Sequence, residues 1–221
     1  MSTLAQLEAR VSQALLDVAN AIFTTGLIDE ALRLALHQYS EVSPLGMETV
    51  RTLPGAGREI ALSSVSGFVA ATEVWWPYAT TGSEVWPPNR VRGFRVWWDD
   101  GSPVLFLDVV PGSQPQTSDS LRLWYTKRHT IQNLDSGDAT TMLFEHESML
   151  VLGAAGYACL ARSVDLNETA ANQAVSTPNY GAQASMYLNE FRAWLALVRA
   201  NPQSRGGDIF GSGWRLDKWD L

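Results

Sequence analysis

The chain of 221 residues contains a single cysteine and no apolar run long enough to cross a bilayer. One cysteine, Cys159, excludes an intrachain disulfide framework and a zinc site made of cysteines. It lies in the apolar run 149–161, where we interpret it as a small buried hydrophobe and not as a reactive thiol. That run is shorter than the roughly 18 residues that a membrane-spanning helix needs, so the sequence predicts no membrane contact.

Basic residues are also scarce. Lys and Arg total 16 against 23 Asp and Glu, and only Lys127 and Lys218 are lysines. The formal net charge of −7 argues against binding nucleic acid through its phosphates, which needs clustered basic side chains. The N-terminus has no basic stretch followed by an apolar one, which predicts no signal peptide and a reducing cytoplasm as the place of synthesis.

Aromatic side chains, by contrast, are abundant. The chain has nine Trp, seven Phe and six Tyr, and 46% of its residues are hydrophobic. A chain that stays disordered does not have this composition. Its length suits one medium domain or two small ones with a real core.

The first part of the chain has a helical period. Residues 3–23 carry one apolar stripe at three- and four-residue spacing, formed by Leu4, Leu7, Val11, Leu15, Val18 and Ile22. We expect Thr3 to cap this helix and Gly26 to end it. A second helix is predicted over 28–42, ended by Ser43-Pro44. The short connection between the two predicts a helical hairpin.

An exposed ion pair is predicted on the second helix. Asp29 and Arg33 stand four residues apart, which places them on the same face of a helix.

From 47 to 132 the period changes to that of strands. Short runs rich in Val, Ile, Phe and Trp alternate with Gly, Pro, Asn and Asp, at 47–53, 58–63, 68–76, 90–98, 103–110 and 120–128. Asp100-Gly101 is typical of a tight hairpin turn. Six short strands at near-regular spacing predict a small antiparallel sandwich or barrel.

Two further helices are predicted, over 141–163 and 182–200, with Thr141 as a plausible cap of the first. Gly153 and Gly156 weaken that first helix, which is apolar nearly all round. Two glycines three residues apart in such a helix predict that another backbone approaches closely, either inside the bundle or between subunits.

The last segment, 206–221, is rich in glycine but also carries Ile209, Phe210, Trp214 and Trp219. A flexible linker would lack such large side chains. We therefore interpret the segment as a tail that docks onto a partner; a tail that folds back onto its own subunit is the alternative.

The fold class predicted from these patterns is α+β. A four-helix bundle is built from an N-terminal helical hairpin and two long C-terminal helices, with an inserted antiparallel β-sandwich or barrel and an extended C-terminal tail. The predicted segments are 1–46 for the hairpin, 47–132 for the insertion, 133–205 for the completing helices and 206–221 for the tail.

A search for chemistry finds no catalytic constellation. Glu145-His146-Glu147 is the only dense His and carboxylate cluster, but consecutive helical residues point about 100° apart and do not converge on one metal ion. We interpret it as a solvated helix start. Nucleophile-elbow, phosphate-loop and calcium-loop patterns are also missing from the sequence. The sequence therefore predicts no enzymatic activity, no metal site and no cofactor.

Two tryptophan pairs stand within predicted strands, Trp75-Trp76 and Trp97-Trp98. Neighbouring residues of a strand face opposite sides, so one Trp of each pair is expected to face the core and the other to face out. The outward Trp has three possible roles: a protein contact, a residue covered by a loop, or a platform on which a sugar stacks.

Three stretches together resemble a known family: the hairpin end at 31–44, the passage from 123–134 into 145–158, and the tail at 206–221. Their order and residue types are similar to those of the head-to-tail adaptor (connector) proteins of tailed bacteriophages. The resemblance spans most of the chain, although the 47–132 insertion is larger than the connections of the simplest all-helical adaptors.

The resemblance implies a structural virion protein of the neck, at the capsid vertex, assembled in the host cytoplasm. Such adaptors form a homo-oligomeric ring, usually a dodecamer, beneath the portal protein, and they receive the tail or a stopper protein while the genomic DNA passes through. A dozen copies at −7 each would total roughly −84, a field that discourages DNA from adhering to a channel wall. The tail residues Ile209, Phe210, Trp214 and Trp219 would dock to the portal. The alternatives are another neck, head-completion or baseplate component, or a carbohydrate-binding module that uses exposed Trp.

Overall fold

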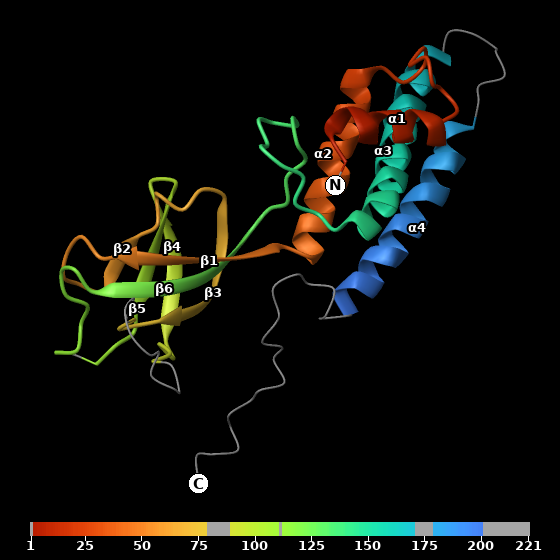
Figure 1. Ribbon diagram of the computed structural model, residues 1–221. Helices are drawn as coiled ribbons and strands as arrows, with labels where there is room; N and C mark the ends of the chain where they lie inside the picture. Colours follow the sequence, from red (N-terminus) through yellow and green to blue (C-terminus); the bar gives the residue numbers. More distant parts are fainter. Residues whose placement is uncertain (1, 79–88, 111, 171–178, 201–221) are drawn as a thin grey trace. The chain divides into compact units, whose positions relative to one another are not determined.

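The computed structural model describes residues 2–78, 89–110, 112–170 and 179–200 of the chain. In this part the protein is a mixed α+β chain with four α-helices and two small antiparallel sheets (Figure 1), which confirms the predicted class at that level of detail. Two compact units divide the chain: a helical unit, Met1–Leu45 with His129–Leu221, and a β unit, Gly46–Arg128. The finer prediction of a four-helix bundle with an inserted sandwich stays a prediction.

Helix α1, Leu4–Ala14, begins at the predicted cap. The Thr3 hydroxyl accepts from the Gln6 backbone N–H and the Gln6 side chain accepts from the Thr3 backbone N–H, which closes a capping box. The helix is much shorter than the predicted 3–23. Leu16 takes a left-handed conformation, φ +57°, and the residues up to Phe23 form a loop instead of two more turns.

The buried carboxylate of Asp17 explains this early end. It accepts hydrogen bonds from the backbone N–H groups of Ala21, Ile22 and Phe23 at 3.0, 2.8 and 2.7 Å. These bonds give the backbone N–H groups of the loop the partners that carbonyl groups would supply in a longer helix. Val18 therefore leaves the predicted apolar stripe and is 75% exposed.

Helix α2, Thr25–Val42, starts three residues earlier than predicted, with Thr24 as its cap. Gly26 therefore lies in the first turn of α2 and does not end α1, contrary to the prediction. The predicted Asp29–Arg33 pair is also wrong. Arg33 instead binds Glu30 at 3.0 Å and Asp135 at 2.9 Å, because a loop distant in sequence offers it a second carboxylate.

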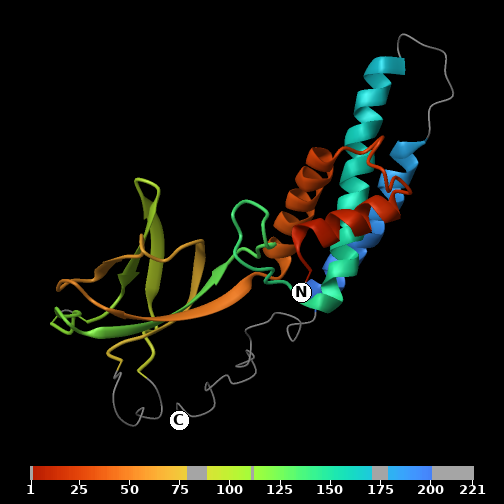
Figure 2. The ribbon, with the colours of Figure 1, turned by 45° about the horizontal axis from the view of Figure 1, so that its top comes forward.

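A one-turn 3₁₀ helix η1, Phe144–His146, precedes helix α3, Glu147–Ala170. The predicted start at 141 is therefore wrong. Thr141 does not cap the helix; its hydroxyl accepts from the Thr130 backbone N–H at 2.9 Å. Helix α4, Tyr180–Ala200, follows close to the predicted range. Helix α3 contacts the other three helices (Figures 1 and 2), so it is the central element of the helical unit.

Apolar side chains from the four described helices, from the loop between α1 and α2 and from the 131–142 segment form the core of the helical unit. Its fully enclosed members include Leu7, Val11, Phe23, Ile28, Leu32, Tyr39, Ile131, Met142, Leu150, Ala154, Ala155, Ala158, Cys159 and Phe191. Cys159 is buried, and burial raises the pKa of its thiol to about 11, so it is the small hydrophobe predicted.

The six strands of the β unit lie close to the predicted runs. They are β1 (Leu45–Thr52), β2 (Glu59–Ala61), β3 (Phe68–Trp75), β4 (Phe94–Asp99), β5 (Ser102–Leu107) and β6 (Ser120–Lys127). Asp100 and Gly101 join β4 to β5 with positive φ angles of 44° and 74°, which confirms the predicted tight turn.

Two separate sheets result, in the orders β1-β6-β3 and β2-β5-β4. The predicted barrel is wrong for the described strands, since no hydrogen-bonded ladder among them joins one sheet to the other to close the circle. Both sheets contribute to a single apolar core, formed by Leu53, Ile60, Leu62, Phe68, Val74, Leu105, Leu107, Leu121, Leu123 and Tyr125.

The β unit ends a few residues before the predicted 132. His129 and Ile131 are buried in the helical unit, so residues 129–132 belong to that unit.

Candidate functional site

The two glycines predicted to mark a close contact lie on the α3 surface that faces α4. A Cβ atom built on Gly153 would stand 2.8 Å from Cδ1 of Phe191, and one built on Gly156 would stand 2.8 Å from Cγ of Leu188. Real side-chain atoms do not approach so closely, so only glycine leaves room for these side chains. The neighbours are side chains of α4 in the same subunit, and the alternative of an interface between subunits stays a prediction.

Glu147, the last residue of the predicted solvated cluster, is fully buried. Its carboxylate accepts from the backbone N–H and the hydroxyl of Ser2 at 2.9 and 2.6 Å, and from Arg10 at 2.9 Å. Burial opposes ionisation, but these hydrogen bonds and the charge of Arg10 outweigh it and lower the pKa of Glu147. The prediction of a solvated helix start is wrong here, because partners at the N-terminus cover the carboxylate.

His146, the middle residue of that cluster, is also engaged. Its Nδ1 forms a hydrogen bond of 2.7 Å with the Tyr39 hydroxyl, and its ring packs edge-on against Trp194 with centroids 5.1 Å apart. Burial lowers the pKa of His146, which favours the neutral ring. The group therefore joins α2, η1 and α4.

His129 connects the segment where the chain leaves the helical unit to the segment where it returns. Its Nε2 donates to the Ser43 carbonyl at 2.8 Å, and its backbone N–H donates to the Ser40 hydroxyl at 3.0 Å. Burial also lowers the pKa of this imidazole. The chain thus leaves the helical unit and returns to it at neighbouring points. The His129 ring also packs against the Tyr39 ring, with centroids 4.9 Å apart.

The polar atoms of Tyr39, His129, His146 and Glu147 named above bind other groups of the same unit. Within the described residues, no three His, Cys, Asp or Glu side chains gather as metal ligands would. The same part of the chain contains no helix that is long and apolar enough to span a membrane.

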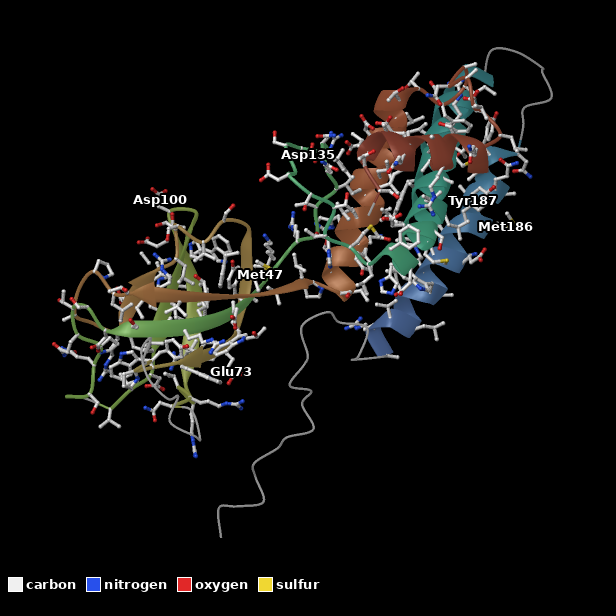
Figure 3. All side chains as sticks on the ribbon, viewed as in Figure 1. Met47, Glu73, Asp100, Asp135, Met186 and Tyr187 are labelled. Carbon is white, nitrogen blue, oxygen red and sulfur yellow. The ribbon has the colours of Figure 1, made fainter. Side chains whose placement is uncertain are left out.

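The helical unit leaves many large apolar side chains exposed: Leu16, Val18, Ile22, Leu34, Leu143, Phe144, Leu160, Val164, Met186 and Leu197. Leu16 is 92% exposed and Leu197 69%. On α4 the neighbours Met186 and Tyr187 differ (Figure 3): the Tyr187 hydroxyl donates to the Ala14 carbonyl at 3.3 Å, whereas Met186 is exposed.

The first tryptophan pair of the β unit divides as strand alternation predicts. Trp76 packs on the core and donates from its ring nitrogen to Asp119 at 3.1 Å. Trp75 lies beside Trp124 with ring centroids 4.4 Å apart, and the guanidinium of Arg122 covers both rings. Those ring faces are therefore taken by Arg122.

The second pair does not divide in this way. Trp97 is 37% exposed and Trp98 57%, although Trp98 contacts Phe68 at the edge of the core. The prediction that one member is covered by the core is wrong, because the pair adjoins the Asp100-Gly101 turn at the end of its strand.

Charge is divided unequally between the units. The β unit carries eight acidic and eight basic residues, so the whole net charge of −7 belongs to the helical unit. The predicted docking residues Ile209, Phe210, Trp214 and Trp219 lie outside the described residues.

No family model matches the sequence, and no curated protein matches it. Among solved structures, the chain is similar to a chain of a structure described as the neck of an empty GTA particle computed with C6 symmetry. The two are 14% identical, and the match covers 81% of this chain and 87% of the other with a TM-score of 0.29. A TM-score of this size does not establish a shared fold.

Proposed function

We propose that the chain is a structural protein of a phage-like neck, with no enzymatic activity and no cofactor. In its more specific form, it is a head-to-tail adaptor that forms a ring beneath a portal protein, extends the DNA channel and receives the tail or a stopper protein. The ordering of helical hairpin, β insertion, further helices and aromatic tail supports this form through the family resemblance.

The observation that carries the proposal is the exposed loop between α1 and α2. Leu16 and Val18 are 92% and 75% exposed, yet the loop that holds them is fixed by the three backbone hydrogen bonds to Asp17. Ser12 adds a hydrogen bond of 2.6 Å to Asn20. Apolar side chains held rigidly in solvent are typical of a protein contact, because little conformational entropy is lost when they are buried.

Ring assembly uses such surfaces in a defined way. Neighbouring subunits of a ring meet through two different patches, and rotation closes the circle. The exposed apolar side chains of the helical unit are surface of this kind that the core of one subunit does not use.

The division of charge supports a channel role. With a neutral β unit, about a dozen copies would concentrate roughly −84 charges in the helical units. Like charge keeps a DNA backbone from adhering to a wall and so favours its passage.

The proposal is tested with the double variant Leu16→Asp and Val18→Asp in the full chain. Both positions are exposed, so the fold and the melting temperature are expected to stay within about 2 °C of the wild type. Incorporation into portal-bearing heads that lack the protein is expected to fall at least tenfold, by quantitative mass spectrometry. Val50→Asp with Val69→Asp, two 45% exposed positions of the β unit, is the matched control. Equal incorporation of the two double variants would show that the loop takes no part in assembly.

The exposure of Trp97 and Trp98 favours a second candidate, a surface- or carbohydrate-binding role of the β unit. A glycan that binds there would change the tryptophan fluorescence, and Trp98→Ala would abolish that change. An unchanged spectrum across a panel of polysaccharides would exclude it.

A further inference from the structure

The sheet β2-β5-β4 has an outer face that points away from the core of the β unit. On β5, Phe106 alternates with the buried Leu105 and Leu107, so its side chain lies on this outer face. The strand register places Glu59 of β2 on one side of Phe106 and Arg95 of β4 on the other. An acid, an aromatic ring and a base therefore form one row across the sheet.

The next row of the same face is apolar. The register places Val104 of β5 between Ala61 of β2 and Trp97 of β4. The rings of Trp97 and Phe106 belong to neighbouring rows, and their centroids lie 5.7 Å apart with an interplanar angle of 38°. Trp97 is exposed and Phe106 is half-buried. The two rings thus form an open aromatic platform next to the acid and the base.

The polar groups beside this platform favour a neutral ligand that carries hydroxyl groups. Glu59 and Arg95 are exposed, and neither forms an ion pair or a side-chain hydrogen bond with another described residue. The carboxylate accepts hydrogen bonds and the guanidinium donates them, while their two charges cancel. A sugar ring matches this pattern, because it has an apolar face of C–H groups and hydroxyl groups that both donate and accept.

The size of the face also favours a small ligand over a protein. Three neighbouring strands span about 10 Å, and two rows of one face stand about 7 Å apart along the strands. A stable protein partner would cover about 800 Å² on each side, which is several times the area of these two rows.

We propose that the outer face of β2-β5-β4 binds a neutral glycan, with a sugar ring stacked on Trp97 and Phe106 and its hydroxyl groups bonded to Glu59 and Arg95. A β-1,4-linked chain is flat and extended, so it suits an open sheet face better than a coiled glycan does. The inference rests on the second candidate function, the carbohydrate-binding role of the β unit, and gives that role a site. It does not depend on a place in a particle neck.

An NMR titration of the full chain with cellohexaose and with chitohexaose tests the inference. The nine Trp side chains each give one indole N–H signal, and the signal missing from Trp97→Phe identifies that of Trp97. This signal is expected to shift saturably with at least one of the two glycans. Trp97→Ala should weaken the affinity, followed on the backbone amides of β5, by about tenfold. Arg95→Ala, a change at an exposed position, should weaken it by about threefold.

Trp98→Ala is the matched control. Trp98 is the next residue of the same strand and is 57% exposed, but it points to the other side, where its ring contacts Phe68. Its removal takes away a fluorescent reporter close to the site, yet the affinity measured by NMR should stay within about twofold of the wild type. An unchanged amide spectrum outside β4 and β5 shows that each variant is folded.

Three results would overturn the inference. The first is the absence of a saturable shift with either glycan. The second is binding that survives Trp97→Ala and is lost in Trp98→Ala, which would leave the carbohydrate-binding role standing but place it on the other side of β4. The third is a Trp97 signal that responds to protein concentration and to neither glycan, which would make a second copy of the chain the partner of this face. Incorporation into heads is measured separately, so none of these results bears on the neck proposal.

Discussion

At the residue scale, the packing of the helical unit depends on a few positions that tolerate no larger side chain. A Cβ atom built on Gly156 would stand 2.8 Å from Cγ of Leu188 and 3.1 Å from Cβ of Tyr187. Gly181, in the first turn of α4, has no atom within 4 Å of that position. Of these two glycines, Gly156 is therefore expected not to tolerate a side chain, and Gly181 is expected to tolerate one.

Replacing Gly156 with Leu is expected to lower the free energy of unfolding by about 1–3 kcal/mol, because the added side chain forces α4 away from α3. Gly181→Ala is the control, and it should be neutral or stabilise by up to about 1 kcal/mol through its helix propensity. Denaturant unfolding measures both. Equal stability of the Gly156→Leu protein and the wild type would mean that the contact contributes nothing.

A second prediction concerns Glu8, whose carboxyl group neighbours that of Asp29. Burial, a hydrogen bond to Asp29 and the charge of Asp29 together raise the pKa of Glu8 to about 7. A raised pKa favours the protonated group in the folded state. Its contribution to stability is therefore complete below the ordinary value near 4.5 and is lost as the pH rises through about 7.

Glu8→Gln is expected to remove this dependence. Its melting temperature should match that of the wild type at pH 5 and exceed it at pH 8, because the amide carries no charge opposite Asp29. Glu190→Gln, an exposed change on α4, provides the comparison and should follow the wild type at both values. A wild-type advantage at pH 8 would contradict the assigned pKa.

Several of these residues follow from the sequence and others do not. Two glycines in an apolar helix are a local pattern, so their close contact could be predicted. The burial of Glu147 could not, because its partners Ser2 and Arg10 stand more than 130 residues away. The same holds for Arg33, whose second partner, Asp135, lies in a loop that no periodicity identifies.

At the element scale, the hydrophobic period locates helices and strands but not where they begin and end. Helix α1 ends at Ala14 because Asp17 binds loop backbone, a contact within a few residues that the apolar stripe of the sequence conceals. The two sheets were predicted only as a sandwich or barrel, since pairing between distant strands is not encoded in any one run.

The attachment of the β unit leads to a third prediction. Ser43 and His129 are joined by a hydrogen bond of 2.8 Å, so the chain ends left by removing residues 46–128 lie close together. A linker of about four Gly and Ser residues is long enough to join them. The excised protein is expected to keep its helical circular dichroism and to unfold cooperatively, since the helical unit has a core of its own.

Limited proteolysis examines the same claim from the other side. Cuts in the full chain are expected first at the two boundaries of the β unit, near 44–46 and 128–129, and only later inside its strands. Early cleavage scattered through 90–110, or an excised protein without a cooperative transition, would mean that the two units depend on each other for folding.

At the scale of the whole molecule, a neutral β unit and a helical unit with the full charge of −7 are combined in one chain. Exposed apolar side chains gather in the charged unit, Leu16 and Val18 foremost. Composition alone indicated the net charge, but only the division into units shows where it resides.

The central claim is that this protein is a repeated structural component of a particle neck. Its most direct test is the copy number of the intact chain in purified particles, measured by quantitative mass spectrometry against a portal protein of the same particles. The account predicts about a dozen copies per particle, lost together with tail attachment in the Leu16→Asp and Val18→Asp variant. Complete, tailed particles that contain none of the chain would contradict it.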